Sequence, residues 1–345
     1  MTPRIGDKRG GLLRFRKRLS SNGAFGNAGF FAIGAAAVAA TVAVVAVWAW
    51  RRFGPSTYMR FDTMFGRARV YQVQDGDGRA VRLLEVGGIV QSGTFVDERY
   101  TELVFEYLKR YDLMFEAQRP MRRVCVLGCG GYDYPEHLIA HHPGVVVDAV
   151  EIDPAITAIA RQYFFLDRLI AEYDVEETGR LNLVCSDALE HLLAGVSSDD
   201  YSSAFDRPST EILTTAVSSE DADGLLGFRQ GEANVFGAVG DARAAGVCYD
   251  AIVNDTFDAG APPAHLTTAA FAHAVHARLV EGGLYLTNIV SALEGEGSRF
   301  LHEQVALLEA EFAHVYVVPC DADSLTEPDN VIVVATDTAL PEGLL

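Results

Sequence analysis

Two segments of this chain pair apolar runs with residues that could do chemistry. The segment Val253–Asp258 reads V-N-D-T-F-D, so an apolar run ends in two carboxylates, Asp255 and Asp258. Upstream, Val126–Gly131 reads V-L-G-C-G-G and breaks into glycines before a helix-like stretch. A carboxylate within hydrogen-bond reach helps an amine lose a proton, and a glycine loop suits a nucleoside ligand. The alternative is structural, since Asp at a strand end also caps helices or holds loops.

Two further acids extend the glycine loop into a predicted cofactor site. Glu151 ends the next apolar run, in V-E-I-D-P, at the distance where an acid accepts hydrogen bonds from ribose hydroxyls. Asp187 ends the third run, in C-S-D-A, where it could accept from an adenine amino group. Singly, Asp153 and Asp187 can each be a helix N-cap. Sites at three successive strand ends favour an adenosyl cofactor, with Gly128, Gly130 and Gly131 in its loop.

Metal and nucleophile chemistry have less support. His137, His141 and His142 lie on one predicted helix, but no third ligand at a fixed spacing and no H-E-x-x-H motif accompanies them. We therefore expect no metal site. No Ser or Cys stands in a recognisable nucleophile elbow.

The elements that must position these residues alternate between strands and helices from residue 123 onward. The expected strands are 124–127, 145–151, 181–185, 249–254 and 283–289, and the expected helices are 135–142, 154–165, 188–194 and 268–279. A helix over 298–312 and strands over 314–318 and 330–336 would close the sheet as an antiparallel pair. Alternation of this kind predicts an α/β fold with a mostly parallel, Rossmann-like sheet, in which ligands bind beyond the carboxyl ends of the strands.

A small antiparallel lobe is expected at 59–118, before the α/β domain at 119–340. Strand-like runs on either side of Asp75–Gly78 predict a β-hairpin. A short strand over Ile89–Gln91 and a helix over Asp97–Tyr111 should follow. Residues 196–246 interrupt the α/β domain with an acidic, Ser- and Gly-rich insertion that enters at the amino end of a strand, opposite the ligand crevice. Its composition predicts partial disorder.

The N-terminal region has the pattern of a membrane anchor. Residues 1–28 form a basic tail, and residues 29–50 hold no charge and are rich in Ala and Val. About 20 such residues span a bilayer, so we expect one uncleaved transmembrane helix. The basic tail favours an outside position for the large domain, whereas the five widely spaced cysteines favour the cytoplasm, towards which we lean. The net charge of −19 argues against nucleic acid as a partner and would attract small cations such as polyamines.

From about Arg67 to Thr336 the chain resembles the spermidine synthase (polyamine aminopropyltransferase) family, and within it the bacterial domains attached to membrane segments. V-G-G-I-V-Q, ending at Gln91, is similar to the family's L-D-G-V-I-Q, and Tyr100 in R-Y-T-E stands at the spacing of its Y-x-E. N-D-T-F-D followed by P-P-A-H-L-T-T is the most specific match. H-V-Y-V-V-P and N-V-I-V-V-A-T-D resemble the closing strands.

The resemblance implies a class I methyltransferase-like α/β fold and aminopropyl transfer from decarboxylated S-adenosylmethionine to a putrescine-like amine. Glu151 would bind ribose and Asp187 the adenine edge, with Gln91 also at the cofactor. Asp255, Asp258 and Tyr100 would be catalytic. A homodimer is implied as well.

The chain departs from the family in its glycine loop, which reads G-G-G-D-G in the family. Gly131 stands in place of the acid, and Asp133 follows two residues later. Thr101 replaces the Gln or His after the tyrosine, and Ala259 replaces a Pro. Two alternatives therefore stay open: an S-adenosylmethionine-dependent methyltransferase, and a non-catalytic, membrane-anchored module that binds a nucleoside.

Overall fold

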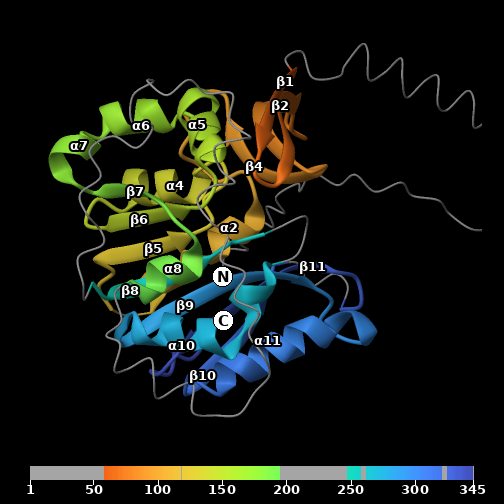
Figure 1. Cartoon of the computed structure of the whole chain (residues 1–345), viewed down its shortest axis with the longest axis vertical. Helices are drawn as coiled ribbons and strands as arrows, with labels where there is room; N and C mark the ends of the chain where they lie inside the picture. The colour runs from red at the N-terminus through yellow and green to blue at the C-terminus, as the bar shows by residue number, and fades with distance from the viewer. Residues whose placement is uncertain (1–57, 118, 195–246, 258–261, 321–324, 345) are drawn as a thin grey trace, which may run out of the picture.

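Two β-sheets form the frame of the protein in the computed structural model, which describes residues 58–117, 119–194, 247–257, 262–320 and 325–344 (Figure 1). The smaller sheet is antiparallel with its strands in chain order: β1 (Tyr58–Thr63), β2 (Gly66–Gln74), β3 (Ala80–Val86) and β4 (Ile89–Phe95). The predicted hairpin turn joins β2 to β3, where Asp75 Oδ1 accepts from the backbone N–H groups of Asp77 and Arg79. A second turn, at Gly87 and Gly88 with φ of 59° and 92°, joins β3 to β4, and β4 continues to Phe95, beyond its expected end at Gln91.

The larger sheet has the order β10-β11-β9-β8-β5-β6-β7. Its strands are β5 (Arg123–Leu127), β6 (Val146–Glu151), β7 (Leu181–Cys185), β8 (Tyr249–Asn254), β9 (Leu279–Ser291), β10 (His314–Pro319) and β11 (Asp329–Thr336). Neighbours from β9 to β7 pair in parallel, and β11 runs antiparallel to both β9 and β10. The α/β prediction, with a mostly parallel sheet closed by an antiparallel pair, is confirmed.

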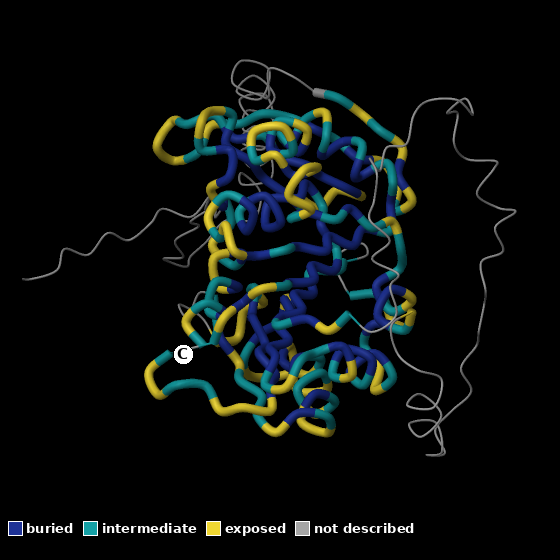
Figure 2. Tube along the Cα trace, turned by 90° about the vertical axis from the view of Figure 1, so that its left-hand side faces the viewer, coloured by how far each residue is buried: buried dark blue, intermediate teal, exposed yellow. Residues whose placement is uncertain are grey.

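Helices cover both faces of the larger sheet because its buried strands are apolar on both sides. Val124 and Val126 of β5 belong to a core with residues of α4, α5 and α6, whereas Cys125 and Leu127 belong to a second core with α8, α10 and α11. Buried residues accordingly follow the sheet through the middle of the molecule, and exposed residues lie at its rim (Figure 2). The helix bounds are α2 (Glu106–Arg110), α3 (Leu113–Glu116), α4 (Asp133–His141), α5 (Pro154–Tyr163), α6 (Leu166–Glu172), α7 (Val175–Thr178), α8 (Ala188–Leu193), α10 (Ala269–Ala277) and α11 (Arg299–Glu309), with 3-10 turns η2 (Ala264–Thr267) and η3 (Glu296–Ser298).

The largest correction concerns the helix predicted over Asp97–Tyr111. Only α2, of five residues, is helical there. Asp97 Oδ1 accepts from the backbone N–H of Arg99 at 2.9 Å, a local bond that competes with helix formation. The prediction also missed β1, α6 and α7.

Several predicted features lie outside the described residues: the tail 1–28, the transmembrane segment 29–50, the insertion 196–246 and Asp258. Among the residues that the structure does describe, no helix combines the length and the apolar character needed to cross a membrane. The lobe and domain boundaries stay predictions.

Candidate functional site

A cavity of about 800 Å³ lies where β5, β6, β7 and β8 end, on the side of the sheet expected for ligands. The small sheet and α2 close it from the other side, through residues such as Gln91 of β4 and Tyr107 of α2. Four carboxylates line it: Asp133, Glu151, Asp187 and Asp255. The remaining wall is largely apolar and aromatic, as is usual for small-molecule sites.

Glu151 is held by the glycine loop at one end of this cavity. Its Oε2 accepts from the backbone N–H groups of Cys129 (3.1 Å) and Gly130 (3.3 Å), and its Oε1 accepts from Asp153 N (3.0 Å). Burial raises the pKa of Glu151, and the three backbone hydrogen bonds oppose that rise. The glycine loop and Glu151 thus hold each other in place. When ionised, the Glu151 carboxylate accepts hydrogen bonds and donates none.

Asp187 caps a helix and also lines the cavity. Its Oδ1 accepts from Leu189 N (2.9 Å) and Glu190 N (3.1 Å), so it caps α8. Its Oδ2 lies 2.8 Å from Nε2 of His265, which also lines the cavity. The sequence did not single out His265; its position in P-P-A-H-L, after the acidic segment, was the only signal.

Asp255 lies across the cavity from Glu151, at the end of β8. Its Oδ2 accepts from the hydroxyl of Tyr107 at 3.0 Å, and its Oδ1 accepts from Nδ2 of Asn288 at 3.0 Å. Burial raises its pKa, while these hydrogen bonds lower it. The Tyr107 pKa is raised well above its ordinary value by burial and by Asp255, so Tyr107 stays a donor. Tyr107 was not among the predicted site residues.

Asp133 is a second buried carboxylate of the site, and no role was predicted for it. It is the first residue of α4, and only 8% of it is exposed. Its Oδ2 accepts from Gly93 N at 2.9 Å, whereas its Oδ1 is buried without a hydrogen-bond partner. Burial raises the pKa of Asp133 to about 7, with a further contribution from Asp255.

Gly131 has no room for a side chain, because Phe164, Asp133 and Ser92 all approach it closely. A Cβ at position 131 would lie 2.7 Å from Phe164 Cδ1, 2.9 Å from Asp133 Oδ1 and 2.9 Å from Ser92 Cβ. Asp133 therefore puts its carboxylate where a side chain of residue 131 would begin. Gly128 is confined in the same way, since its Cβ would lie 2.8 Å from Asp255 O.

The predicted site residues do not all meet. Gln91, Gly128, Gly130, Glu151, Asp187 and Asp255 line the cavity. Gly131 does not line it but supports the loop, its N–H donating to Ser92 Oγ at 2.6 Å. The prediction for Tyr100 needs correction: it is not among the lining residues, and its hydroxyl donates to Glu172 at 2.9 Å while its ring packs on Phe165.

The cavity is electrostatically one-sided. None of the described residues that line it is Lys or Arg, and His265 is their only basic side chain. A second acceptor, Asn288 Oδ1, is buried without a hydrogen-bond partner among the described residues. Low-dielectric surroundings strengthen the attraction of such a chamber for a cation.

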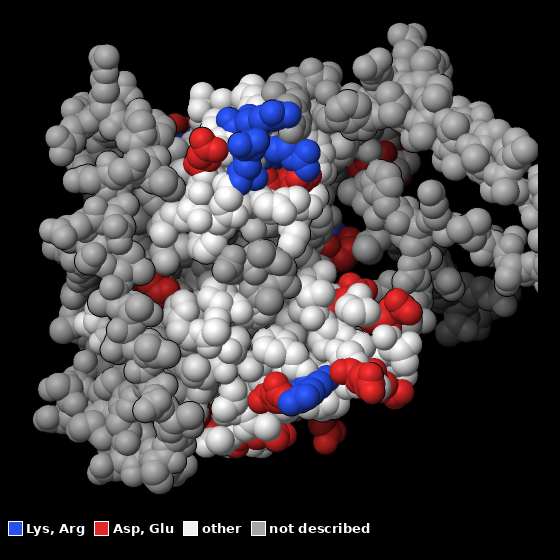
Figure 3. All heavy atoms as spheres, turned by 45° about the vertical axis from the view of Figure 1, so that its right-hand side comes forward, with Lys and Arg blue, Asp and Glu red and all other residues white. Residues whose placement is uncertain are grey.

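Basic side chains do gather elsewhere on the molecule. On the face shown in Figure 3 they form a patch near the top of the view, and acidic side chains with a smaller basic group between them lie in its lower half. The pairing of β1 with β2 places Arg60 opposite Arg69 in the small sheet. Surface charge is thus separated from the acidic cavity.

Solved structures share this arrangement of sheets and helices. A probable spermidine synthase from Corynebacterium glutamicum ATCC 13032 matches with a TM-score of 0.57 at 18% identity, over 83% of this chain and 82% of its own. Spermidine synthase from Thermotoga maritima matches with a TM-score of 0.50 at 15% identity, over 84% of this chain and 75% of its own. The fold is that of the spermidine synthases.

A third spermidine synthase, solved with the transition state analogue AdoDATO, matches this fold at a TM-score of 0.51 and 14% identity, over 84% of this chain and 76% of its own. No protein-family model matches the chain, and no curated protein does. At these identities the likeness shows the fold alone, and the reaction must be argued from the site.

Proposed function

We propose that this protein is a spermidine synthase-like aminopropyltransferase, which transfers an aminopropyl group from decarboxylated S-adenosylmethionine to an amine. The observation that carries the proposal is the composition of the cavity: a glycine loop with Glu151 and Asp187, together with the buried acid Asp133 and the half-buried acid Asp255. The first group suits a nucleoside. The second group suits ammonium groups, which only donate hydrogen bonds.

The donor would lie with its nucleoside against the glycine loop. Glu151, oriented by three backbone donors, would accept from ribose hydroxyls. Asp187 would accept from the adenine amino group through Oδ2, the atom that His265 contacts in this structure. Gln91 lines the same cavity from the small sheet.

Asp133 would hold the ammonium of the aminopropyl chain. Its orphaned Oδ1 is a buried acceptor without a partner, and such groups are costly unless a ligand satisfies them. The carboxylate also stands where the family's glycine-loop acid would begin, because it fills the space beside Gly131. In this proposal the acid has moved two residues along the chain and kept its place in space.

Asp255 would act on the acceptor amine. The amine nitrogen, once neutral, attacks the carbon next to the sulfonium; a C–N bond forms, the C–S bond breaks, and its electron pair stays on sulfur, releasing methylthioadenosine. The proton lost by the amine goes to Asp255, whose orientation Tyr107 and Asn288 fix. Positioning of the two reactants supplies most of the remaining acceleration.

The absence of Lys and Arg from the described lining favours the decarboxylated donor over S-adenosylmethionine itself. The ordinary cofactor carries a carboxylate beside its ammonium, and that carboxylate would approach the buried Asp133 and the half-buried Asp255. Like charges in a low-dielectric site repel strongly. Methyl transfer and simple nucleoside binding are therefore the alternatives that the experiment must separate.

The test uses the full-length protein with decarboxylated S-adenosylmethionine and a mixture of di- and polyamines, analysed by mass spectrometry. We expect methylthioadenosine and an aminopropylated amine in equal amounts. Asp255→Asn should lower turnover by about 100-fold or more, the usual range for a lost proton acceptor, and leave the affinity for methylthioadenosine nearly unchanged. Nucleoside binding without either product would contradict aminopropyl transfer for these amines. Loss of binding together with turnover would mean that Asp255 is structural.

Two features outside the described residues complete the proposal. We propose that residues 29–50 anchor the protein in a membrane, with the catalytic part towards the cytoplasm where the donor is made, and that the chain forms a homodimer. Extraction of the protein from membranes only by detergent would support the anchor. Light scattering of the extracted protein tests the dimer.

A further inference from the structure

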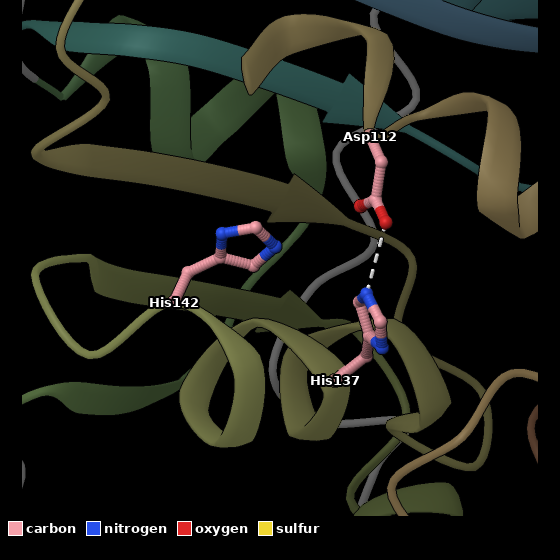
Figure 4. A group of neighbouring side chains, drawn as sticks. All are labelled: Asp112, His137 and His142. Carbon is pink, nitrogen blue, oxygen red and sulfur yellow. Dashed lines mark hydrogen bonds and ion pairs between the residues drawn. The ribbon is translucent and has the colours of Figure 1, made fainter. Parts of the chain in front are cut away.

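A group of three side chains outside the cavity has the composition of a metal site. Asp112 lies between α2 and α3, His137 is on α4, and His142 follows the last residue of α4. One ligand atom from each of the three lies within 4.8 Å of the others. Figure 4 shows Asp112 and His137 pointing towards each other, with the ring of His142 beside the gap.

The hydrogen bonds of His137 show what this group lacks. Its Nδ1 lies 3.2 Å from the backbone oxygen of Thr101, which can only accept, so Nδ1 carries the hydrogen. In the neutral ring Nε2 is then an acceptor, and it faces Oδ2 of Asp112 at 3.0 Å. Two acceptors at this distance need a cation between them, which is either a proton on the ring or a metal ion.

The other two residues are oriented for the same point. The Tyr134 hydroxyl donates to Asp112 Oδ1 at 3.1 Å, which leaves Oδ2 for the ion. The His142 ring is stacked on Phe115 with centroids 3.5 Å apart and planes 3° apart, which fixes its direction. Partners that orient a ligand in this way are typical of metal sites. A proton on His137 would account for the contact with Asp112, but it would not explain why a ligand atom of His142 lies close to both.

We propose that Asp112, His137 and His142 bind one divalent transition-metal ion of the Zn²⁺ class. Two imidazoles and one carboxylate suit such an ion, and three protein ligands leave a position for water.

The ion would hold the wall of the cavity. Asp112 follows Tyr111, and Tyr111 and Tyr134 both line the cavity, from α2's end and from α4. A metal bridge between these elements would therefore join the two helical segments that carry the proposed ammonium site. The bridge does not depend on the proposed reaction, since it requires only these three side chains.

The experiment measures Co²⁺ binding to the full-length protein after removal of metal with a chelator. Cobalt bound by nitrogen and oxygen ligands at low coordination number gives visible absorption that the hydrated ion lacks, and the titration gives the stoichiometry. We expect one Co²⁺ per chain, displaced by Zn²⁺, with binding weakened at least about 10-fold in His142→Ala and in Asp112→Asn.

His141→Ala is the matched control. This histidine is adjacent in sequence and its ring lies 4.6 Å from that of His137, but it is not one of the three. Binding should persist in it. Asp112→Asn keeps a side-chain oxygen that can accept from Tyr134, so this variant tests the site even if His142→Ala misfolds. Circular dichroism of the metal-free proteins would report such misfolding. No visible band, or equal weakening in all three variants, overturns the proposal and leaves a protonated His137 between its partners.

Discussion

The pKa of Asp133 makes the affinity for the proposed donor depend on pH. Only the ionised carboxylate attracts the ammonium group of decarboxylated S-adenosylmethionine, and the ammonium itself stays charged near neutrality because amine pKa values lie near 10. Burial raises the pKa of Asp133 to about 7. The acid is therefore protonated below that pH in the ligand-free protein and ionised above it.

The size of the effect follows from the ionised fraction. With a pKa of about 7, roughly nine-tenths of Asp133 is ionised at about pH 8 and roughly one-tenth at about pH 6. The apparent dissociation constant for the donor should therefore rise about 10-fold from the higher pH to the lower one. Methylthioadenosine, which has the nucleoside but no ammonium, should bind equally well at both.

Calorimetric titration of both ligands into the full-length protein at the two pH values measures this difference. Asp133→Asn should weaken donor binding at the higher pH by about 10- to 100-fold, the value of a hydrogen bond to a charged group, and should abolish the pH dependence. Asp255→Asn should move the midpoint to lower pH, because the charge of Asp255 helps to raise the pKa of Asp133. A donor-to-methylthioadenosine affinity ratio that stays constant across this range refutes the assignment of Asp133 to the ammonium.

Three further variants test other parts of the structure. Tyr107→Phe removes a donor to the proposed base and should lower kcat about 10-fold, whereas Tyr100→Phe should leave kcat unchanged, because that hydroxyl bonds outside the cavity; equal kcat losses in steady-state assays would contradict this. Gly131→Ala should lower the free energy of unfolding by about 1–3 kcal/mol in denaturant titrations, since its Cβ would lie 2.7 Å from a ring carbon, and the control Gly144→Ala, with no atom within 4 Å, should have little effect. Asp148→Ala should cost about 1.5–3 kcal/mol by the same measurement, because it removes a buried carboxylate that accepts at 2.8–3.0 Å from the half-buried guanidinium of Arg123; a loss below about 1 kcal/mol would show that the pair contributes little.

The strands of the larger sheet were the most predictable part of the fold. Buried parallel strands read as continuous apolar runs, and β7 and β8 match their predicted bounds. The stretch Asp97–Tyr111 misled for a related reason. Tyr100 and Leu103, and likewise Leu108 and Tyr111, are buried there three residues apart, as in a helix, but a local Asp97 bond replaces helical hydrogen bonding. The spacing of apolar residues indicates which side chains are buried, but it does not fix the backbone conformation that buries them.

The site could be predicted where topology alone decides it. Glu151, Asp187 and Asp255 follow strands whose carboxyl ends meet at one edge, so each lies at the cavity. Tyr100 and Tyr107 could not be separated in the same way, because the short helix sets which aromatic side chain points inward. From the sequence, Asp133 was only an acid two residues after the position of the family's acid. The direction of its side chain depends on contacts with Ser92 and Gly93 of the small sheet.

Residues 195–246 occupy a position in the chain where changes need not affect the ligand pocket. They connect α8, which ends at Leu193, to the segment before β8, which begins at Tyr249, and the cavity opens at the other end of that strand. Whatever structure these residues take, they join the fold at the edge of the sheet away from the chemistry. Evolution could therefore have lengthened or rewritten this connection without altering the ligand pocket, and an experimenter can use the same join to insert an affinity tag or a fluorescent reporter.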